Sequence, residues 1–314
     1  MDRDVLPALV VLTGPTASGK TPVAIELARR FGGEIVNADS MQVFQYMDIG
    51  TAKPSLEQRA AVPHHMIDVV KPDIPYSAGR YAEEARAVVA GLHERGRRVF
   101  LTGGTGLYIR AVIEGLLGGA PADPALREEI EALHECALRE GDPLRLYRRL
   151  EREDPQAAEK IHPNDLRRMI RALEIHAQSG SRASRLRGEH GFRERRYRVL
   201  HLALDPGRRE LAVRIDARCR AMIDAGLLRE VRALRDMGYG PALRPMQSIG
   251  YRHMNTVADG RCTLEMALES MQRDTRHFAR RQRTWLRKVE GVQWVDPADL
   301  EPLARRVAEF LESE

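Results

Sequence analysis

Blocks of apolar and polar residues alternate along the first hundred residues in the manner of strands and helices. Four apolar runs predict buried strands, at residues 6–12, 34–38, 65–70 and 98–101. Helical spacing of apolar residues follows at 20–31, and again at 77–95 behind the capping residue Ser77. Strands that alternate with helices predict an α/β fold with a parallel sheet flanked by helices.

The alternation stops near residue 125 and resumes near residue 197. Helical segments follow one another to about residue 178, and the polar, arginine-rich residues 179–196 predict a loop. A strand at 197–204, a helix or helix pair at 208–237, a helix at 264–289 and a closing strand "VQWVD" are then expected. We therefore divide the chain into a catalytic core, residues 1–124 and 196–314, and an all-helical insertion, residues 125–195.

The first strand runs directly into "GPTASGKT", residues 14–21, which has the glycine and Gly-Lys-Thr spacing of a P-loop. In such a loop backbone N–H groups surround phosphate oxygens at the start of a helix. Lys20 supplies a compact positive charge, and Thr21 can ligate a magnesium ion. The core is therefore expected to be P-loop NTPase-like, with its ligands at the carboxyl ends of the strands.

Composition describes an ordinary globular protein, with 43% hydrophobic and 30% charged residues. No apolar run is long enough to span a bilayer, and the first four residues do not begin a signal peptide. The three cysteines, Cys136, Cys219 and Cys262, are far apart, which argues against disulfides and zinc sites. We expect a cytoplasmic protein without a membrane partner.

The net charge of +5 is unevenly distributed. Residues 161–220 hold 15 Arg against 7 acidic residues, and residues 271–288 hold seven basic residues against one acidic residue. Such segregation favours a polyanionic partner, with RNA or DNA the leading candidate. A solvated arginine-rich helix surface is the alternative.

Two polar turns lie beside the P-loop in this topology. "EIVNADS" ends in Asp39, whose carboxylate can organise magnesium or act as a general base, and "RVFLTGGT" ends in Thr105. Each has a simpler explanation, because Asp39 can cap a helix that begins at Ser40 and Thr105 can cap the helix after the glycine turn. No segment that senses a γ-phosphate is recognisable.

Two pairs of residues have both a functional and a structural interpretation. His64 and His65 suggest a metal pair, but adjacent residues of a strand point to opposite faces, which favours packing or surface roles. Trp285 and Trp294 can serve either in the core or as stacking partners for bases.

Eight segments in order resemble the bacterial tRNA dimethylallyltransferases, also called tRNA isopentenyltransferases or the IPP transferase family. They are "GPTASGKT", "NADSMQVFQYMDIGTAKP", "HHMIDVVKP", "YSAGRYAEEA", "LTGGTGLYIRAV", "HPNDLRRMIRALEI", "IGYRHM" and "RRQRTWLRK". The match extends from about residue 8 to residue 296. A single P-loop is too common to identify a family, whereas eight ordered segments are specific.

The resemblance implies transfer of a dimethylallyl group from its diphosphate to the exocyclic amine of the adenine 3′ of the anticodon in tRNA, with release of pyrophosphate. The partners are then dimethylallyl diphosphate and the tRNA anticodon stem-loop, the cofactor is Mg²⁺ on Thr21, and a monomer is expected. The amine is a weak nucleophile, so a base must remove its proton, and the target adenine must first be flipped out of the anticodon stack.

Site residues follow from the same resemblance, position by position. Asp39, Thr105 and Arg127 are expected at the reacting centre. The diphosphate is expected on Gly14, Thr16, Ala17, Ser18, Gly19, Lys20, Thr21 and Arg214. Contacts with tRNA are expected from Asp39, Ser40, Met41, Gln42, Arg167, Arg168, Arg171, Arg280, Arg281 and Arg287. Gln42 carries both the donor and the acceptor needed to read an adenine edge.

Two other functions are compatible with a P-loop. A small-molecule or nucleotide kinase would turn over ATP and would not need the arginine-rich insertion. A non-catalytic RNA-binding module would retain the loop without using it, and its function would survive Asp39→Ala. The coexistence of loop, carboxylate and basic segments favours the two-substrate transferase.

Overall fold

A computed structural model describes residues 6–116, 123–190 and 196–313 of the chain. The chain divides into two compact units, a discontinuous one of Met1–Ile113 and Arg195–Glu314 and a continuous one of Glu114–Glu194. The insertion therefore begins with the end of a helix at residue 114, somewhat before the boundary at 125 that the sequence analysis drew. Residues 191–195, at its other boundary, lie outside the described residues. Each unit is described by itself below.

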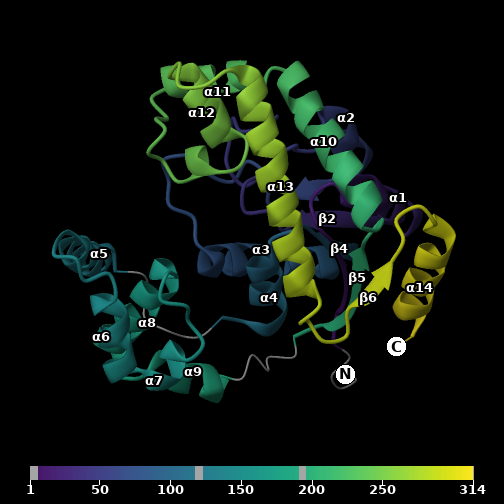
Figure 1. Cartoon of the computed structure of the whole chain (residues 1–314). Coiled ribbons are helices and arrows are strands. Elements are labelled where there is room, and N and C mark those ends of the chain that lie inside the picture. Colours follow the sequence, from purple (N-terminus) through teal and green to yellow (C-terminus); the bar gives the residue numbers. More distant parts are fainter. Residues whose placement is uncertain (1–5, 117–122, 191–195, 314) are drawn as a thin grey trace. The chain divides into compact units, whose positions relative to one another are not determined.

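The discontinuous unit is built on one parallel sheet in the order β3-β2-β4-β1-β5-β6 (Figure 1). Its strands are β1 (Ala8–Thr13), β2 (Gly33–Asn37), β3 (His64–His65), β4 (Arg98–Thr102), β5 (Arg198–Leu204) and β6 (Gln293–Val295). The central strand β1 has partners on both sides, since Val10 is in register with Phe100 of β4 and with Leu200 of β5. The parallel α/β fold predicted from the sequence is confirmed.

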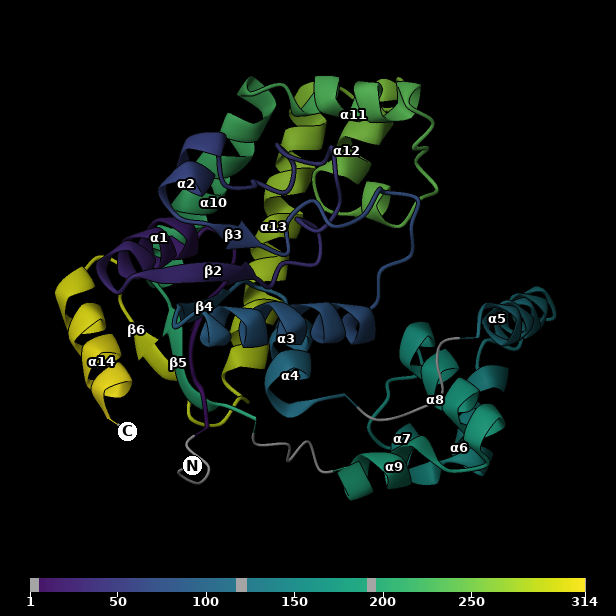
Figure 2. The ribbon, with the colours of Figure 1, turned by 180° about the vertical axis from the view of Figure 1, so that it is seen from behind.

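Both faces of this sheet are buried, because successive side chains of a strand point to opposite sides. Leu9 and Val11 of β1 pack into one hydrophobic cluster, and Val10 and Leu12 pack into another. The second cluster includes helix α1 (Lys20–Arg30) and the C-terminal helix α14 (Leu300–Glu312), which lie on one side of the sheet (Figure 2). Helix α14 has no counterpart in the sequence prediction.

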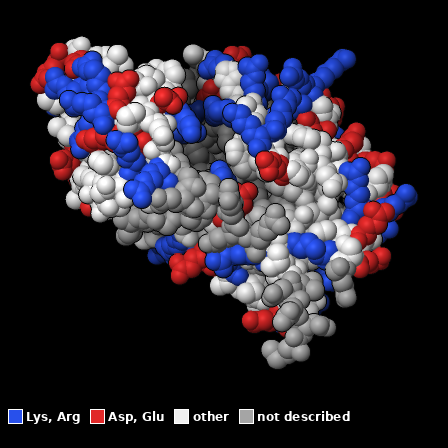
Figure 3. All heavy atoms as spheres, turned by 90° about the horizontal axis from the view of Figure 1, so that it is seen from below, with Lys and Arg blue, Asp and Glu red and all other residues white. Residues whose placement is uncertain are grey.

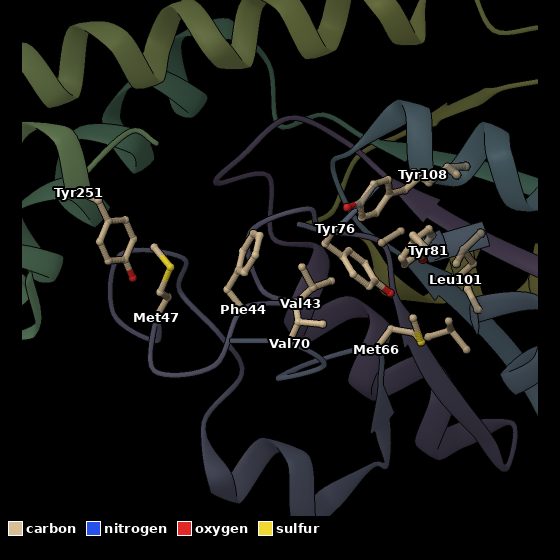
Figure 4. Packing of buried hydrophobic residues seen from close by; sticks show 14 of the residues in the cluster. Val43, Phe44, Met47, Met66, Val70, Tyr76, Tyr81, Leu101, Tyr108 and Tyr251 are labelled. Atoms are coloured by element: carbon tan, nitrogen blue, oxygen red, sulfur yellow. The ribbon is translucent and has the colours of Figure 1, made fainter. Parts of the chain in front are cut away.

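The first cluster includes the helices on the other side of the sheet. These are α3 (Ala78–Glu94), α4 (Gly106–Glu114), α10 (Arg208–Asp224), α11 (Leu227–Asp236), α12 (Tyr251–Ala258) and α13 (Leu264–Leu286). The short α2 (Leu56–Ala61) and the 3-10 turn Pro245–Gln247 complete the unit. Figure 4 shows how a long loop joins this cluster: its Met47 lies beside Tyr251, and its Phe44 and Val43 lie near Val70.

Local details explain where the elements begin and end. The Ser77 hydroxyl accepts from the Arg80 amide and caps α3, as the sequence predicted. Residues 208–237 form two helices rather than one, since Gly226 between them has a left-handed φ of 97°. The strand predicted at 65–70 is mostly wrong: β3 ends at His65, because Met66 and Asp68 adopt positive φ values of 62° and 57°.

The continuous unit is all helical, with a core of its own around Ile130, Leu150 and Leu173. Its helices are α5 (Pro124–Arg139), α6 (Arg145–Glu153), α7 (Pro155–Ala158), α8 (Leu166–Ser179) and α9 (Ala183–His190). The loop predicted at 179–196 is wrong for α9. Asp154 accepts hydrogen bonds from the amide and hydroxyl of Ser184, at 2.8 and 2.5 Å, and so satisfies the first turn of that helix from 30 residues away.

Candidate active site

The P-loop connects β1 to α1 and leaves backbone amides available at the helix start. Gly14 has a φ of 148°, and a Cβ there would lie 2.5 Å from the Leu204 carbonyl oxygen, so only glycine fits. Gly19 forms the N-cap of α1 with a φ of 89°. Within the described residues, the amides of Ala17 and Gly19 donate no hydrogen bond. The buried Ser18 hydroxyl is likewise without a partner there. These groups form a phosphate-sized cradle.

The Lys20 side chain folds back over the loop and bonds to backbone carbonyl groups of the loop. Its Nζ donates to the carbonyl oxygens of Gly14 and Pro15, at 3.1 and 2.8 Å. Burial, together with the positive charge of Arg218, lowers the pKa of Lys20 to about 7, and only the Asp39 carboxylate opposes this. An anion bound at the loop would restore the usual pKa, so the site is electrostatically prepared for a phosphate group.

Asp39 lies at the carboxyl end of β2, across the cavity from the loop. Its Oδ1 accepts from the amides of Met41, at 2.8 Å, and Gln42, at 3.4 Å, whereas Oδ2 has no hydrogen-bond partner within the described chain. No helix begins at Ser40, so the helix-capping alternative for Asp39 is wrong. The carboxylate stabilises a turn with one oxygen and keeps the other available to a ligand.

Thr105 is connected both to the same turn and to α4. The Ser40 amide donates to Thr105 Oγ1 at 2.9 Å, and this hydroxyl donates to Ser40 Oγ at 3.2 Å. The Thr105 carbonyl oxygen accepts from the Ile109 amide at 3.2 Å at the start of α4, so its place at the helix start and its bonds to the turn are compatible. Thr105 fixes the position of the Asp39 turn relative to β4.

Gln42 is placed differently from what its expected role requires. The side chain is 8% exposed, and its Nε2 donates to the carbonyl oxygens of Thr51 and Ala52, at 3.1 and 3.2 Å. Both amide protons are thus used within the protein, and only Oε1 is left to accept a hydrogen bond from a base. The contact of Gln42 with adenine stays a prediction, and in this structure Oε1 is the atom available for it.

A single cavity of about 500 Å³ brings these groups together. Its polar wall holds Thr16, Lys20, Thr21, Asp39 and Thr105, among others. Its apolar wall is provided mainly by α10 and α13, with Cys219, Met222, Ile249, Met271 and Phe278. Charged and apolar side chains lining the same cavity match a ligand that has a charged head and a hydrocarbon tail.

Arg218 also lines this cavity and was not found from the sequence. Desolvation by burial lowers the pKa of its guanidinium, and the Asp39 charge opposes the shift. In the described parts of the chain Arg218 has no hydrogen bond and no ion pair, although buried arginines are normally paired. The residue predicted instead, Arg214, lies one helical turn earlier, where its Nε donates to Glu210 at 2.7 Å. Their spacing of four residues was the only available signal.

Gln282 of α13 is a second residue that the sequence did not single out. Its Oε1 accepts from the Thr16 amide at 2.8 Å, and its Nε2 donates to the Gly104 carbonyl at 2.9 Å. One side chain therefore joins the P-loop to the turn that carries Thr105. The closeness of this turn explains its glycines, since a Cβ on Gly104 would lie 2.5 Å from Gln282 Nε2.

The arginines predicted on α13 are exposed at or near this cavity. Arg280, Arg281 and Arg287 form no ion pair among the described residues, and Arg281 also lines the cavity. Arg283 is different, because it pairs with Asp205 at 2.7 Å. Neither tryptophan belongs to the core: Trp294 is 37% exposed, and Trp285 is half-buried against Gly106.

The other predicted residues lie in the helical unit. Arg127 donates from Nε and Nη2 to both oxygens of Glu174, each at 2.9 Å, and Arg171 donates to the same carboxylate at 2.6 Å. Burial alone would raise the pKa of Glu174, but these arginines and the Asp123 amide lower it overall. Arg168 pairs with Asp165 at 3.2 Å, and Arg167 is exposed. The roles of these four arginines stay predictions.

On the face shown in Figure 3, Lys and Arg side chains form larger groups than Asp and Glu side chains.

His64 bonds to the Val62 carbonyl and His65 to Glu34, and the described residues contain no group of three His, Cys, Asp or Glu side chains that could hold a metal. Within these residues no helix combines the length and apolar character that a membrane span requires.

Fold and site together define a P-loop protein whose cavity suits a phosphorylated ligand with an apolar portion, next to a carboxylate with one uncommitted oxygen. Two models of known protein families match this chain. Residues 42–289 match the IPP transferase model, and residues 7–68 match the isopentenyl transferase model. The chain therefore belongs to the IPP transferase family.

Individual relatives cover nearly the whole chain. It is 52% identical over 304 residues to a tRNA dimethylallyltransferase of Anaeromyxobacter dehalogenans, covering 96% of this chain and 97% of the relative. Among solved structures it is similar to the tRNA isopentenylpyrophosphate transferase of Bacillus halodurans, with 38% identity, a TM-score of 0.71 and 97% coverage of both chains. A eukaryotic dimethylallyltransferase described as acting on tRNA gives a TM-score of 0.80 at 27% identity, over 96% of this chain and 77% of the other.

Proposed function

We propose that this protein transfers a dimethylallyl group from dimethylallyl diphosphate to the exocyclic amine of the adenine 3′ of the anticodon in tRNA, releasing pyrophosphate. The observation that carries the proposal is the composition of one cavity. A phosphate cradle with two partly buried cations, apolar side chains and the Asp39 carboxylate line the same space. Its membership of the IPP transferase family supports the same reaction.

The cations hold the donor and offset charge as its bond breaks. Departure of pyrophosphate leaves positive charge on the allylic carbon and adds negative charge to the bridging oxygen. The loop amides, Lys20 and Arg218 lie where they can stabilise that negative charge. Arg218 is proposed for this role together with Arg214, the residue expected from the sequence. Arg218 has no acidic partner among the described residues, and Nη1 of Arg214 would lie 3.8 Å from a Cβ on Gly19 of the loop.

Asp39 acts as the general base. The lone pair of the adenine amine is delocalised into the ring, so loss of a proton must accompany formation of the new C–N bond. Oδ2 of Asp39 is available to accept that proton, while Oδ1 is fixed by the Met41 and Gln42 amides. A base held in this way typically contributes about 10²- to 10⁴-fold in rate.

Magnesium is the proposed cofactor, and the donor set fits it. Thr21 lines the cavity with its hydroxyl uncommitted to any described residue, and Asp39 is the carboxylate of the same wall. Mg²⁺ commonly takes one or two protein oxygens and completes its shell with phosphate oxygens and water. Thr21 would hold the ion there. The ion and Lys20 would together neutralise the charge of the diphosphate.

The acceptor is recognised by residues of both units. Arg280, Arg281 and Arg287 of α13 are exposed and have no acidic partner in the described chain, as phosphate contacts require. Arg167, Arg168 and Arg171 are proposed as the contacts of the helical unit, and the place of Arg127 at the reacting centre stays a prediction. We further propose that the protein acts as a monomer in the cytoplasm, where tRNA is found.

The decisive experiment uses purified protein, Mg²⁺, radiolabelled dimethylallyl diphosphate and an unmodified anticodon stem-loop. A second stem-loop carries inosine at the target position and therefore lacks the exocyclic amine. We expect the adenine RNA to become labelled, with one pyrophosphate released for each dimethylallyl group transferred. The inosine RNA should stay unlabelled. Equal labelling of both RNAs would contradict the proposed acceptor atom.

The rival functions are tested in the same experiment. A kinase would consume ATP in a parallel reaction and leave the RNA unlabelled. An RNA-binding module would retain the stem-loop on a filter without releasing pyrophosphate. Either outcome would overturn the proposal.

A further inference from the structure

Two cavities of the α/β unit share part of one wall. The first is the active-site cavity of about 500 Å³, and the second is a more open cavity of about 730 Å³. The second is lined by Tyr46, Ile49 and Leu56 on the loop side and by Ala221 and Ala225 of α10. Three residues line both cavities: Ala52, Arg218 and Met222. The two spaces are therefore separated by very few side chains.

Helix α10 aligns the phosphate end of the site with this shared wall. Arg218 and Met222 are four residues apart, so they lie on one face of the helix, about 6 Å apart along its axis at ~1.5 Å per residue. That distance is comparable to the length of one five-carbon unit. A donor whose diphosphate is bound by Arg218 and whose tail follows α10 reaches Met222 at the end of its first isoprene unit.

Only one of the three shared residues can act as a removable partition. Ala52 is too small, and its backbone is held by Gln42 Nε2, which donates to the Ala52 carbonyl at 3.2 Å. Arg218 carries the charge proposed to bind the diphosphate. Met222 is 9% exposed and presents a flexible, apolar side chain to both spaces.

We propose that Met222 sets the length of the isoprenoid donor by closing the active-site cavity toward the second cavity. This inference rests on the proposed function and adds a specificity determinant to it. With methionine present, a single isoprene unit fits between the diphosphate and the wall. A donor with two units, such as geranyl diphosphate, would need the space that the Met222 side chain fills.

The second cavity is chemically suited to receive the longer tail once that side chain is shortened. Its side chains Tyr46, Ile49 and Leu56 are apolar, and Leu56 is 83% exposed, so the space is accessible. The charged groups that line only this cavity are already paired, since Lys53 Nζ bonds to Asp48 and Asp68 at 2.7 and 2.6 Å and Arg59 bonds to Asp68 at 2.8 Å. The shared Arg218 is the group proposed to bind the diphosphate. A hydrocarbon tail there would leave no new unpaired charge.

The test compares two methionines of the same cavity. Met222→Ala shortens the shared wall, whereas Met271→Ala shortens the α13 wall, which borders the active-site cavity but not the second one. For each protein, kcat/KM is measured with dimethylallyl diphosphate and with geranyl diphosphate, using the anticodon stem-loop as acceptor. The ratio of the two values cancels any general loss of activity.

We expect Met222→Ala to raise the geranyl-to-dimethylallyl ratio by about 10- to 100-fold. Met222→Val should raise it less, and Met271→Ala by less than about threefold. The valine variant also provides the answer if the alanine variant does not fold. A wild-type protein that uses both donors equally, an equal rise for Met271→Ala, or no rise in either Met222 variant would overturn the inference. Failure of wild-type protein to use any allylic donor would instead overturn the proposed function.

Discussion

Arg218 of the α/β unit, which the structure brought to attention, and Arg127 of the helical unit, which the sequence predicted, have opposite environments. Arg127 is 40% exposed and forms a double hydrogen bond with a carboxylate that is fully buried. Arg218 faces a cavity and has no acidic partner among the described residues. A paired arginine is held in one conformation before any ligand arrives, whereas a partly buried arginine without an acidic partner is stabilised when an anion binds.

The largest effect should come from removing the unpaired cation. Arg218→Gln is expected to weaken pyrophosphate binding by about 100-fold, because charge-assisted hydrogen bonds contribute about 1.5–3 kcal/mol. The free energy of unfolding should not fall, since the variant no longer buries an unpaired charge. Isothermal titration with pyrophosphate and chemical denaturation measure the two quantities.

The exposed Arg220 of the same helix provides the control for that experiment. Arg220→Gln removes one positive charge from α10 without altering the cavity wall, so the pyrophosphate affinity should change less than about threefold. Equal losses for both variants would mean that only the net charge of α10 matters, and the comparison of Arg218 with Arg127 would fail.

Removing the paired arginine should affect stability instead. Arg127→Met leaves the buried Glu174 with fewer hydrogen bonds, and we expect the helical unit to lose about 1–3 kcal/mol of unfolding free energy. Both tryptophans, Trp285 and Trp294, belong to the other unit, so the measurement is hydrogen exchange of the α5 and α8 amides. Arg148→Met, which breaks an exposed ion pair with Asp142, should cost less than about 1 kcal/mol. Equal losses of unfolding free energy in the two variants would contradict the inference that Glu174 holds Arg127 in position.

The third prediction concerns how the pyrophosphate affinity depends on pH through Lys20. Its pKa is about 7 in the free protein, and a bound diphosphate must raise it, so binding takes up a proton above pH 7. Pyrophosphate affinity should therefore fall by up to about tenfold per pH unit above 7. Lys20→Arg keeps the charge at all these pH values and should remove this part of the pH dependence, since the ionisation of pyrophosphate itself is common to both proteins. Identical pH profiles would contradict the shifted lysine.

The smallest of these effects should come from removing Gln282, whose side chain joins the P-loop to the turn that carries Thr105. Gln282→Leu breaks the bonds to the Thr16 amide and the Gly104 carbonyl, and kcat/KM for transfer should fall by about tenfold. Gln272→Leu on the same helix removes one bond to the Asp216 carbonyl and should have little effect on transfer. Similar losses would assign Gln282 a purely structural role.

The sequence predicted those parts of the site that are local in the chain. The P-loop, Asp39 and Thr105 each sit in or directly after a strand, so their place at one edge of the sheet follows from topology. Arg218 and Gln282 could not be found in this way, because they reach the loop from helices about 200 and 265 residues further along. Helix periodicity does not distinguish Arg218 from its neighbours Arg214 and Arg220 on an arginine-rich helix.

Errors in the fold prediction have the same origin. Helix α9 was predicted as a loop because its first turn is satisfied by Asp154, a residue that no local pattern connects to Ser184. The strand at 65–70 was overextended because the positive φ values of Met66 and Asp68 depend on tertiary contacts, such as Asp68 with Lys53 and Arg59. Local propensity and apolar runs carry no information on such contacts.

The central claim is that Asp39 removes the proton of the acceptor amine while separate cations hold the donor. A single-turnover measurement with Asp39→Asn, saturating dimethylallyl diphosphate and the anticodon stem-loop tests it directly. The account predicts a transfer rate constant lower by about 10²- to 10⁴-fold, with pyrophosphate affinity within about threefold of wild type. An unchanged rate constant, or a loss explained entirely by weaker pyrophosphate binding, would contradict it.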